Sequence, residues 1–95
     1  MNTSPMHIHV FGKHDCAKCE STRHKLQHYI RKLGVDEKVR LTFIDMDTVD
    51  GMAEGAFRDV HHVPTTIIER DGDAMARWSG MIPASSDLKQ YLGKA

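Results

Sequence analysis

The sequence predicts an α/β fold in which one mixed four-stranded sheet is covered by helices, with its elements in the order β-α-β-α-β-β-α. Residues 6–11 alternate between two faces, a period of two that is typical of a strand. Residues 17–33 place apolar side chains three or four positions apart, as one face of a helix does. Asp71-Gly72 suits a tight antiparallel hairpin. Because a helix joins the first two strands, we expect them to be parallel, with a right-handed connection.

The first strand, over residues 6–11, should follow a loose tail at residues 1–5. A loop over residues 12–15 then leads to a helix over residues 17–33. Gly34 suits the end of that helix. The strand's two faces carry Met6, Ile8 and Val10 on one side and His7, His9 and Phe11 on the other, and the helix should turn inward Cys19, Thr22, Leu26, Ile30 and Leu33.

A second strand is expected over residues 39–45, followed by a helix that Asp47 or Thr48 can cap. One face of this helix is apolar, and Met52 on that face fits a core position. The apolar positions are Val49, Met52, Ala53, Ala56 and Phe57.

Two further strands, over residues 65–69 and 74–78, surround the Asp71-Gly72 turn. Met75 fits a core position, and Trp78 is typical of core packing. After Gly80 a last helix should run from Pro83 or Ala84 to Leu92, with Leu88, Tyr91 and Leu92 as apolar positions and Gly93 at its end.

The length of 95 residues predicts one domain, residues 1–95. Thirteen basic and thirteen acidic residues cancel, so nothing favours a phosphate backbone or an anionic membrane surface. We therefore expect no nucleic-acid and no membrane partner. No apolar run approaches the roughly 20 residues that span a bilayer, and residues 1–9 do not resemble a secretion signal. We expect a cytoplasmic monomer.

The two cysteines lie in one motif, Cys16-Ala17-Lys18-Cys19, at the predicted strand-to-helix junction. In a reducing cytosol such a pair is more often redox-active or metal-binding than structural. Cys16 falls at the helix start, where free N–H groups and the helix dipole can lower a thiol pKa from about 8.5 to roughly 3.5–7.5. Cys19 lies on the inward stripe. We therefore expect Cys16 to attack a substrate disulfide and Cys19 to resolve the mixed disulfide.

The charges around the motif are mixed. Lys13 and Lys18 would stabilise a thiolate and Asp15 and Glu20 would oppose it, so the helix terminus should supply most of the activation. The main alternative is metal or iron–sulfur binding, since C-x-x-C forms half of many zinc sites. The sequence has no second C-x-x-C, which favours redox chemistry, and we expect no metal ligands.

Seven histidines also raise the question of a metal. His24 and His28 are four residues apart on the first helix, a spacing that can share a metal, but they lie off the apolar stripe and indicate a solvated face. His7 and His9 share one face of the first strand, where hydrogen-bonded or partly exposed rings are the main expectation and ligands the alternative. His62 could influence substrate contact.

Val63-Pro64-Thr65 opens the third predicted strand, at a position where proline is tolerated. The stretch from Met6 to Leu92 resembles the thioredoxin superfamily, in which C-x-x-C begins the first core helix and a cis-proline faces it from the third core strand. Cys16, Cys19 and Pro64 take these positions. Similar order and spacing extend to Ile44-Asp45-Met46-Asp47, to Val60-His61-His62 and to Gly80.

The resemblance implies a thioredoxin-like three-layer sandwich, a cis Val63-Pro64 bond, and a substrate site at Val63, Pro64 and Gly80. The backbone at Val63 would pair with an extended substrate segment. Lys13 falls where glutaredoxins carry a lysine that contacts glutathione, and Lys18 lies between the cysteines. The chain has the size of a glutaredoxin, but the residues between its cysteines match neither branch. We expect a thioredoxin-like dithiol protein.

These observations predict a thiol–disulfide oxidoreductase that reduces protein disulfides through the C-x-x-C, in cell redox homeostasis and electron transport. No cofactor is expected beyond the redox-active Cys16–Cys19 disulfide, with glutathione left open. The expected partners are disulfide-containing proteins and a recycling reductase or glutathione. Two alternatives stay open: metal or iron–sulfur binding through the C-x-x-C, and a dedicated electron carrier for one partner enzyme.

Overall fold

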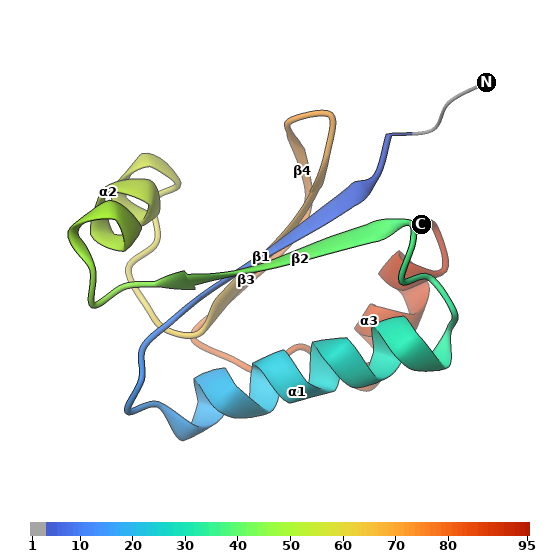
Figure 1. The fold of residues 1–95 in the computed structure, drawn as a ribbon, viewed down its shortest axis with the longest axis horizontal. Coiled ribbons are helices and arrows are strands. Elements are labelled where there is room, and N and C mark those ends of the chain that lie inside the picture. Colours follow the sequence, from blue (N-terminus) through green and yellow to red (C-terminus); the bar gives the residue numbers. More distant parts are fainter. Residues whose placement is uncertain (1–3) are drawn as a thin grey trace.

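Seven elements follow one another along residues 4–95, the part of the chain that the computed structural model describes (Figure 1). Their order confirms the predicted β-α-β-α-β-β-α. Of the predicted tail, residues 1–3 lie outside the described residues, and Ser4 and Pro5 precede the first strand outside any helix or strand. The elements are β1 (Met6–Gly12), α1 (Ala17–Lys32), β2 (Val39–Asp45), α2 (Val49–Phe57), β3 (Thr65–Arg70), β4 (Asp73–Ser79) and α3 (Ser85–Leu92).

The four strands form one mixed sheet in the order β2-β1-β3-β4. β1 runs parallel to β2 and antiparallel to β3, while β3 and β4 form an antiparallel hairpin. The hairpin turns at Asp71 and Gly72, whose φ angles of 55° and 82° are those that a tight hairpin turn needs. Because β1 and β3 are antiparallel, the end of β1 lies beside the start of β3, with Phe11 opposite Thr65.

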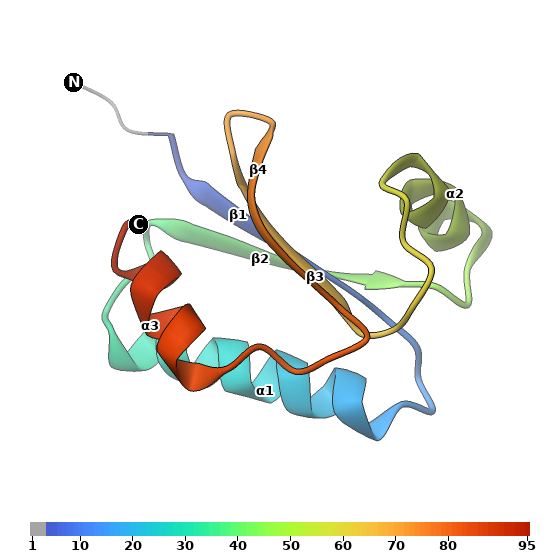
Figure 2. The same cartoon turned by 180° about the vertical axis from the view of Figure 1, so that it is seen from behind.

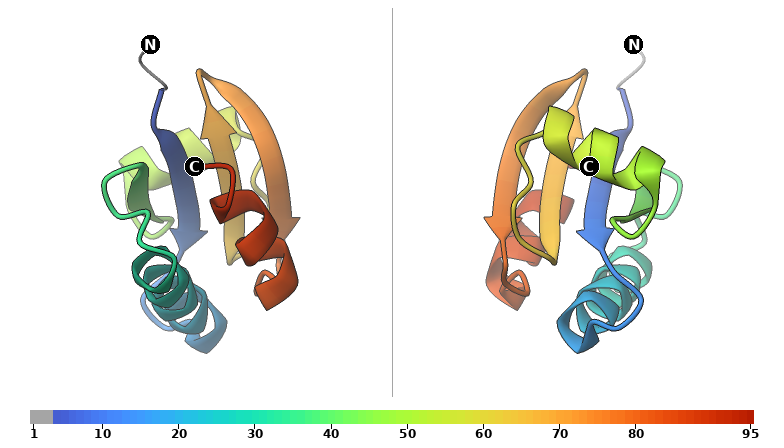
Figure 3. Two further views of the ribbon diagram at one scale, coloured as in Figure 1. Left: turned by 90° about the vertical axis from the view of Figure 1, so that its right-hand side faces the viewer. Right: turned by 90° about the vertical axis from the view of Figure 1, so that its left-hand side faces the viewer.

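The helices cover both faces of the sheet and complete the predicted three-layer fold. α1 and α3 lie on one face and α2 lies on the other (Figure 2, Figure 3). The main core fills the space between the sheet and the α1–α3 layer, because alternate residues of each strand point to that side. Its buried members are Met6, Ile8, Val10, Leu26, Ile30, Ile68, Trp78, Leu88 and Leu92. A smaller cluster of Phe11, Val60 and Ile67 lies on the other face.

α1 buries the predicted stripe except for its last member. Cys19, Thr22, Leu26 and Ile30 are buried, whereas Leu33 is 40% exposed, contrary to the prediction. The helix ends at Lys32 and Leu33 is its C-cap, beyond the part of α1 that packs against the main core. Gly34 follows at φ 67°, the left-handed conformation typical of a helix end.

α2 turns its apolar face to solvent, so the predicted core position of Met52 is wrong. The residues that α2 buries are Gly51 and Gly55. A Cβ atom on Gly51 would lie 1.7 Å from the carbonyl oxygen of Asp45, so only glycine lets the helix approach the end of β2 this closely. The glycine side therefore faces inward and the apolar side is left outside. The large exposed side chains are Val49 at 77%, Met52 at 50% and Phe57 at 84%.

The C-terminal elements differ from expectation only at their ends. β3 and β4 extend slightly beyond the predicted ranges, and α3 begins at Ser85. Trp78 is buried as predicted, and Met75 is half-buried against the main core. The indole N–H of Trp78 donates to Asp87 Oδ2 at 3.3 Å, which ties β4 to the first turn of α3. Among residues 4–95, no helix combines the length and apolarity needed to cross a membrane.

Candidate functional site

Cys16 caps the N-terminus of α1. Its backbone is extended, with φ −140° and ψ 101°, and the helix begins at the next residue. The backbone N–H of Cys19 donates a hydrogen bond to Cys16 Sγ at 3.1 Å. The sulfur thus receives one of the N–H groups that a helix start leaves unpaired, and negative charge on it is stabilised by the positive end of the helix dipole.

Cys16 and Cys19 form a disulfide bond, with their Cα atoms 5.2 Å apart. The two cysteines differ in exposure, since Cys16 is partly exposed and Cys19 is only 1% exposed. Cys19 lies in the first turn of the stripe that α1 packs against the sheet. Cys16 is therefore the sulfur that another molecule can reach.

The segment before β3 lies at the same end of the sheet. The Val63–Pro64 peptide bond is cis, and Pro64 is buried while Val63 is half-buried. Because Thr65 pairs with Phe11, this segment lies beside the end of β1, where the loop to α1 begins. The N–H of Gly80 donates to the Pro64 carbonyl oxygen at 2.7 Å. The structure thus brings Val63, Pro64 and Gly80 together at the edge that carries the N-terminus of α1.

Comparison with known proteins identifies the fold family. The family model of the thioredoxin domain matches residues 6–93. This chain belongs to the thioredoxin family. A comparison with curated protein sequences finds no match.

Solved structures, two of them of thioredoxins, share the fold of this thioredoxin-family chain at low sequence identity. Thioredoxin-2, a component of the malaria parasite's protein secretion machinery, is 18% identical with a TM-score of 0.80 over 97% of this chain and 84% of that chain. Thioredoxin O2 from Arabidopsis thaliana, in its oxidised state, is 19% identical with a TM-score of 0.77 over 96% and 75%. A malarial protein is 18% identical with a TM-score of 0.78 over 95% and 96%.

Identities this low show the fold alone. A thioredoxin-family fold with a disulfide at Cys16 and Cys19 supports thiol–disulfide oxidoreductase chemistry in general terms.

The acidic side chain of Glu20, next to Cys19, has partners of its own. Glu20 accepts a hydrogen bond from Arg23, which lowers the pKa of Glu20, and His24 Nε2 lies 3.1 Å from the same carboxylate. His14 Nε2 lies 2.8 Å from Asp45 Oδ2. The negative charge of Glu20, which the sequence places against a thiolate, is therefore partly neutralised within α1.

Lys13 precedes the cysteines and Lys18 lies between them in the sequence. Both side chains are exposed, and neither forms an ion pair with another described residue. Their positive charges remain available to a bound molecule.

Two close contacts at this site were not predicted from the sequence. Gly12, the last residue of β1, packs directly against Cys19 and Phe43. Gly80, at φ 69°, lies against His62, so that a Cβ atom on Gly80 would be 3.3 Å from the His62 Cβ. An isolated glycine at a strand end is a general signal of close backbone approach, but it does not name the partner.

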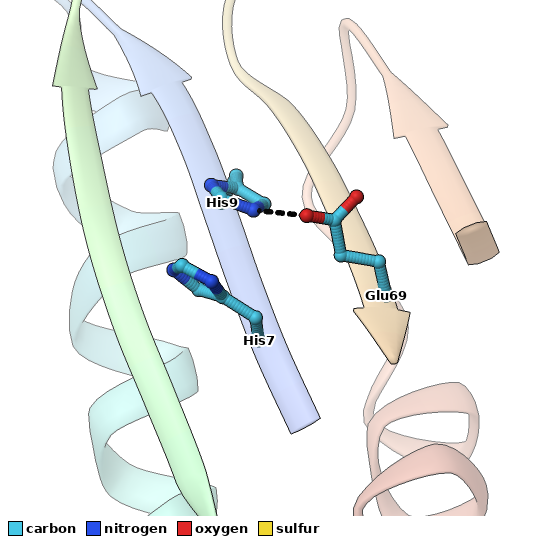
Figure 4. A group of neighbouring side chains, drawn as sticks. All are labelled: His7, His9 and Glu69. Atoms are coloured by element: carbon cyan, nitrogen blue, oxygen red, sulfur yellow. Dashed lines mark hydrogen bonds and ion pairs between the residues drawn. The ribbon is translucent and has the colours of Figure 1, made fainter. Parts of the chain in front are cut away.

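A group of polar side chains, His7, His9 and Glu69, lies on the sheet face opposite α1 (Figure 4). His9 Nε2 lies 2.7 Å from Glu69 Oε1, and His7 Nε2 lies 2.9 Å from Thr42 Oγ1, so both rings are hydrogen bonded as the sequence favours. Ligand atoms of His7, His9 and Glu69 lie within 4.8 Å of one another. Within residues 4–95, these three side chains are close enough to one another to hold one metal ion.

Proposed function

We propose that this chain reduces disulfide bonds in other proteins by a dithiol mechanism in which Cys16 attacks and Cys19 resolves. One observation carries the proposal: Cys16 is partly exposed at the N-terminus of α1, while Cys19, one turn further along, is 1% exposed. The two cysteines differ in solvent exposure and in electrostatic surroundings, as the two steps of thiol–disulfide exchange require.

The first step starts from the reduced chain. The Cys16 thiolate attacks one sulfur of a substrate disulfide, the substrate S–S bond breaks, and one substrate thiolate leaves. The Cys19 N–H, 3.1 Å from Cys16 Sγ, and the α1 dipole stabilise the thiolate before it attacks. A mixed disulfide now joins Cys16 to the substrate.

The second step releases the substrate. Cys19 loses its thiol proton to solvent and its sulfur attacks Cys16 Sγ, so that the mixed disulfide breaks and the second substrate thiolate leaves. The Cα separation of 5.2 Å lets the two sulfurs bond within one turn of α1. Two electrons have passed to the substrate, and a dithiol reductase or glutathione must then reduce the Cys16–Cys19 disulfide.

The segment before β3 supports binding of an extended substrate beside the disulfide. Val63 lies outside the helices and strands, and its backbone forms no hydrogen bond with another backbone group of residues 4–95. It is therefore free to pair with a substrate strand. Gly80, bonded to Pro64, places no side chain over this segment. Lys13 and Lys18, both exposed, add positive charge near the cysteines in the sequence.

The test is reduction of a protein disulfide such as that of insulin, with dithiothreitol as the recycling reductant. Cys16→Ser should lower the rate to that of dithiothreitol alone, and Cys19→Ser should accumulate a mixed disulfide that mass spectrometry assigns to Cys16. His28→Gln, an exposed substitution on α1, is the matched control and should keep the wild-type rate. A Cys16→Ser protein that works as fast as the wild type would refute the proposal.

Two further measurements separate the proposal from its alternatives. A redox titration in glutathione buffers should give a potential near that of thioredoxins, about −270 mV, whereas a value above the glutathione poise would argue against a reductant. Elemental analysis of freshly purified protein tests for metal or iron–sulfur binding at Cys16 and Cys19. Capture with Cys19→Ser distinguishes a general reductant, which traps many proteins, from a carrier that traps one.

A further inference from the structure

We propose that His7, His9 and Glu69 form a binding site for a late first-row divalent metal ion such as Zn²⁺, on the sheet face opposite α1. The two histidines supply ring nitrogens and Glu69 supplies negative charge. The proposal goes beyond the redox function and departs from the expectation that the histidines bind no metal. The proposal is based on three side chains whose ligand atoms lie within 4.8 Å of one another. Their proximity could not be predicted from the sequence.

The strands hold these side chains in place. His7 and His9 are two positions apart on β1 and so point to the same face, and His7 is the register partner of Glu69 on β3. Figure 4 shows the three side chains on one face of the sheet, with α1 behind it. Both strands are internal to the sheet, and a site built on such elements is better ordered than one on loops.

The donor atoms indicate the class of metal. Two imidazoles with one carboxylate are a set that zinc accepts, and neighbouring transition metals share that preference, whereas Ca²⁺ and Mg²⁺ take mainly oxygen ligands. A histidine must be neutral to bind a metal.

His9 contributes an independent observation. Its side chain is only 8% exposed, and its Nδ1 atom is buried without a hydrogen-bond partner among the described residues. The Nε2 atom faces Glu69 at 2.7 Å. A carboxylate that holds one ring nitrogen of a histidine orients the ring for metal binding, and a buried polar atom with no partner is costly unless something binds it.

The charges around the group are of both signs. Arg58 is shared between two carboxylates: Nη1 and Nη2 lie 2.7 and 3.1 Å from the two Glu69 oxygens, and Nε lies 2.9 Å from Glu54 Oε1. Two carboxylates against one guanidinium leave one negative charge beside the imidazoles. Arg40 and Arg70 line the cavity beside His7 and oppose a cation, whereas Asp71 at the same cavity favours one. Arg40 lies exposed on the edge strand β2, where water and salt screen its charge.

An ion can reach the group from solvent. An open cavity of about 270 Å³ is lined by His7, Glu69 and Arg40. The cavity has room for water molecules that would complete the coordination of a bound ion.

The test uses the whole chain in its disulfide form, together with a Cys16→Ser/Cys19→Ser variant, so that no thiolate competes for metal. Equilibrium dialysis against Zn²⁺ or Co²⁺ should give one bound ion per chain in both proteins. Imidazole C–H signals of His7 and His9 should shift on addition of Zn²⁺. Because a metal that binds only the folded chain stabilises it, the Tm should rise by about 10 °C or more at a hundredfold excess of free Zn²⁺ over the Kd.

His7→Gln is the deciding variant, because His7 is only half-buried and its replacement should leave the fold intact. His7→Gln and Glu69→Gln should each weaken binding by about 10- to 100-fold. The matched control is His24→Gln/His28→Gln, whose rings lie exposed on α1 as the sequence predicts, and it should bind like the wild type.

Two results overturn the proposal: less than one bound ion per chain at saturating Zn²⁺, or an affinity that survives His7→Gln. Disulfide reduction is measured separately in the presence of a chelator, so the metal site and the redox function can fail independently.

Discussion

Gly12 and Cys19 are packed so closely that no side chain fits between them. A Cβ atom on Gly12 would lie 3.0 Å from Cys19 Cβ, 3.1 Å from Cys19 Sγ and 2.7 Å from Phe43 Cζ. Gly12 ends β1 and Cys19 lies in the first turn of α1, so this contact seats the redox helix on the sheet. The burial of the second cysteine therefore depends on a glycine from a different element.

Gly12→Ala should destabilise the chain by about 1–3 kcal/mol, because the added methyl group must displace Phe43 or Cys19. Urea unfolding measures the loss. Alkylation of Cys19 in the reduced variant should also become faster than in the wild type. Phe43→Leu, which removes the closest atom, should recover part of the stability when combined with Gly12→Ala. An unchanged unfolding free energy would show that the strand end tolerates a side chain.

In the reduced chain, iodoacetamide should modify Cys16 at least about tenfold faster than Cys19, because Cys16 is partly exposed at a helix start and Cys19 is 1% exposed. Peptide mapping by mass spectrometry after a short reaction measures the ratio. In urea the two cysteines should react alike, which controls for intrinsic differences. Equal labelling in the folded chain would remove the basis for assigning separate attacking and resolving roles.

The exposed apolar face of α2 should contribute little to stability. Val49→Ser and Phe57→Ser are each expected to change the free energy of unfolding by no more than about 0.5 kcal/mol, because both side chains are mostly in water. Leu88→Ala in the main core is the contrast, with an expected cost of about 2–5 kcal/mol. A large loss in Phe57→Ser, seen in chemical denaturation, would mean that this face packs against the domain after all.

Gly51→Ala should be far more damaging than a change on the outer side of the same helix. Its Cβ atom would lie 1.7 Å from the Asp45 carbonyl oxygen, so α2 must move away from the end of β2. We expect a loss of about 3 kcal/mol or more in the free energy of unfolding. Ala53→Ser, on the exposed side of α2, is the control and should stay within about 0.5 kcal/mol. Similar values for the two variants would contradict the close approach.

Arg58→Met should cost about 1–3 kcal/mol, because it leaves the Glu69 carboxylate, whose side chain is 13% exposed, without its main partner. The hydrogen bond from Arg58 lowers the pKa of Glu69, and the carboxylate in turn raises the pKa of Arg58, as a strongly interacting pair should. Arg23→Met breaks the exposed pair with Glu20 and should cost no more than about 1 kcal/mol. Urea denaturation in a chelator compares them, and equal costs would count against the pair as a stabilising contact.

The sequence by itself determines the local features of this protein. The order of the strands and helices, the Asp71-Gly72 turn and the position of Cys16 at a helix start all follow from side-chain period, turn chemistry and capping. The separation between an accessible Cys16 and a buried Cys19 follows from the same helical spacing. These features could be predicted because they depend on residues that are close together in the chain.

The tertiary structure alone decides which surfaces meet. Helical spacing identifies an apolar face on α2 but not that the opposite side is buried, because the close fit of Gly51 against Asp45 involves another element. His9 and Glu69 are 60 positions apart, and only the antiparallel pairing of β1 with β3 brings them to 2.7 Å. The contact of Gly12 with Cys19 likewise depends on how α1 is seated. Contacts of this kind have no local pattern, since the chain must fold before either partner has a neighbour.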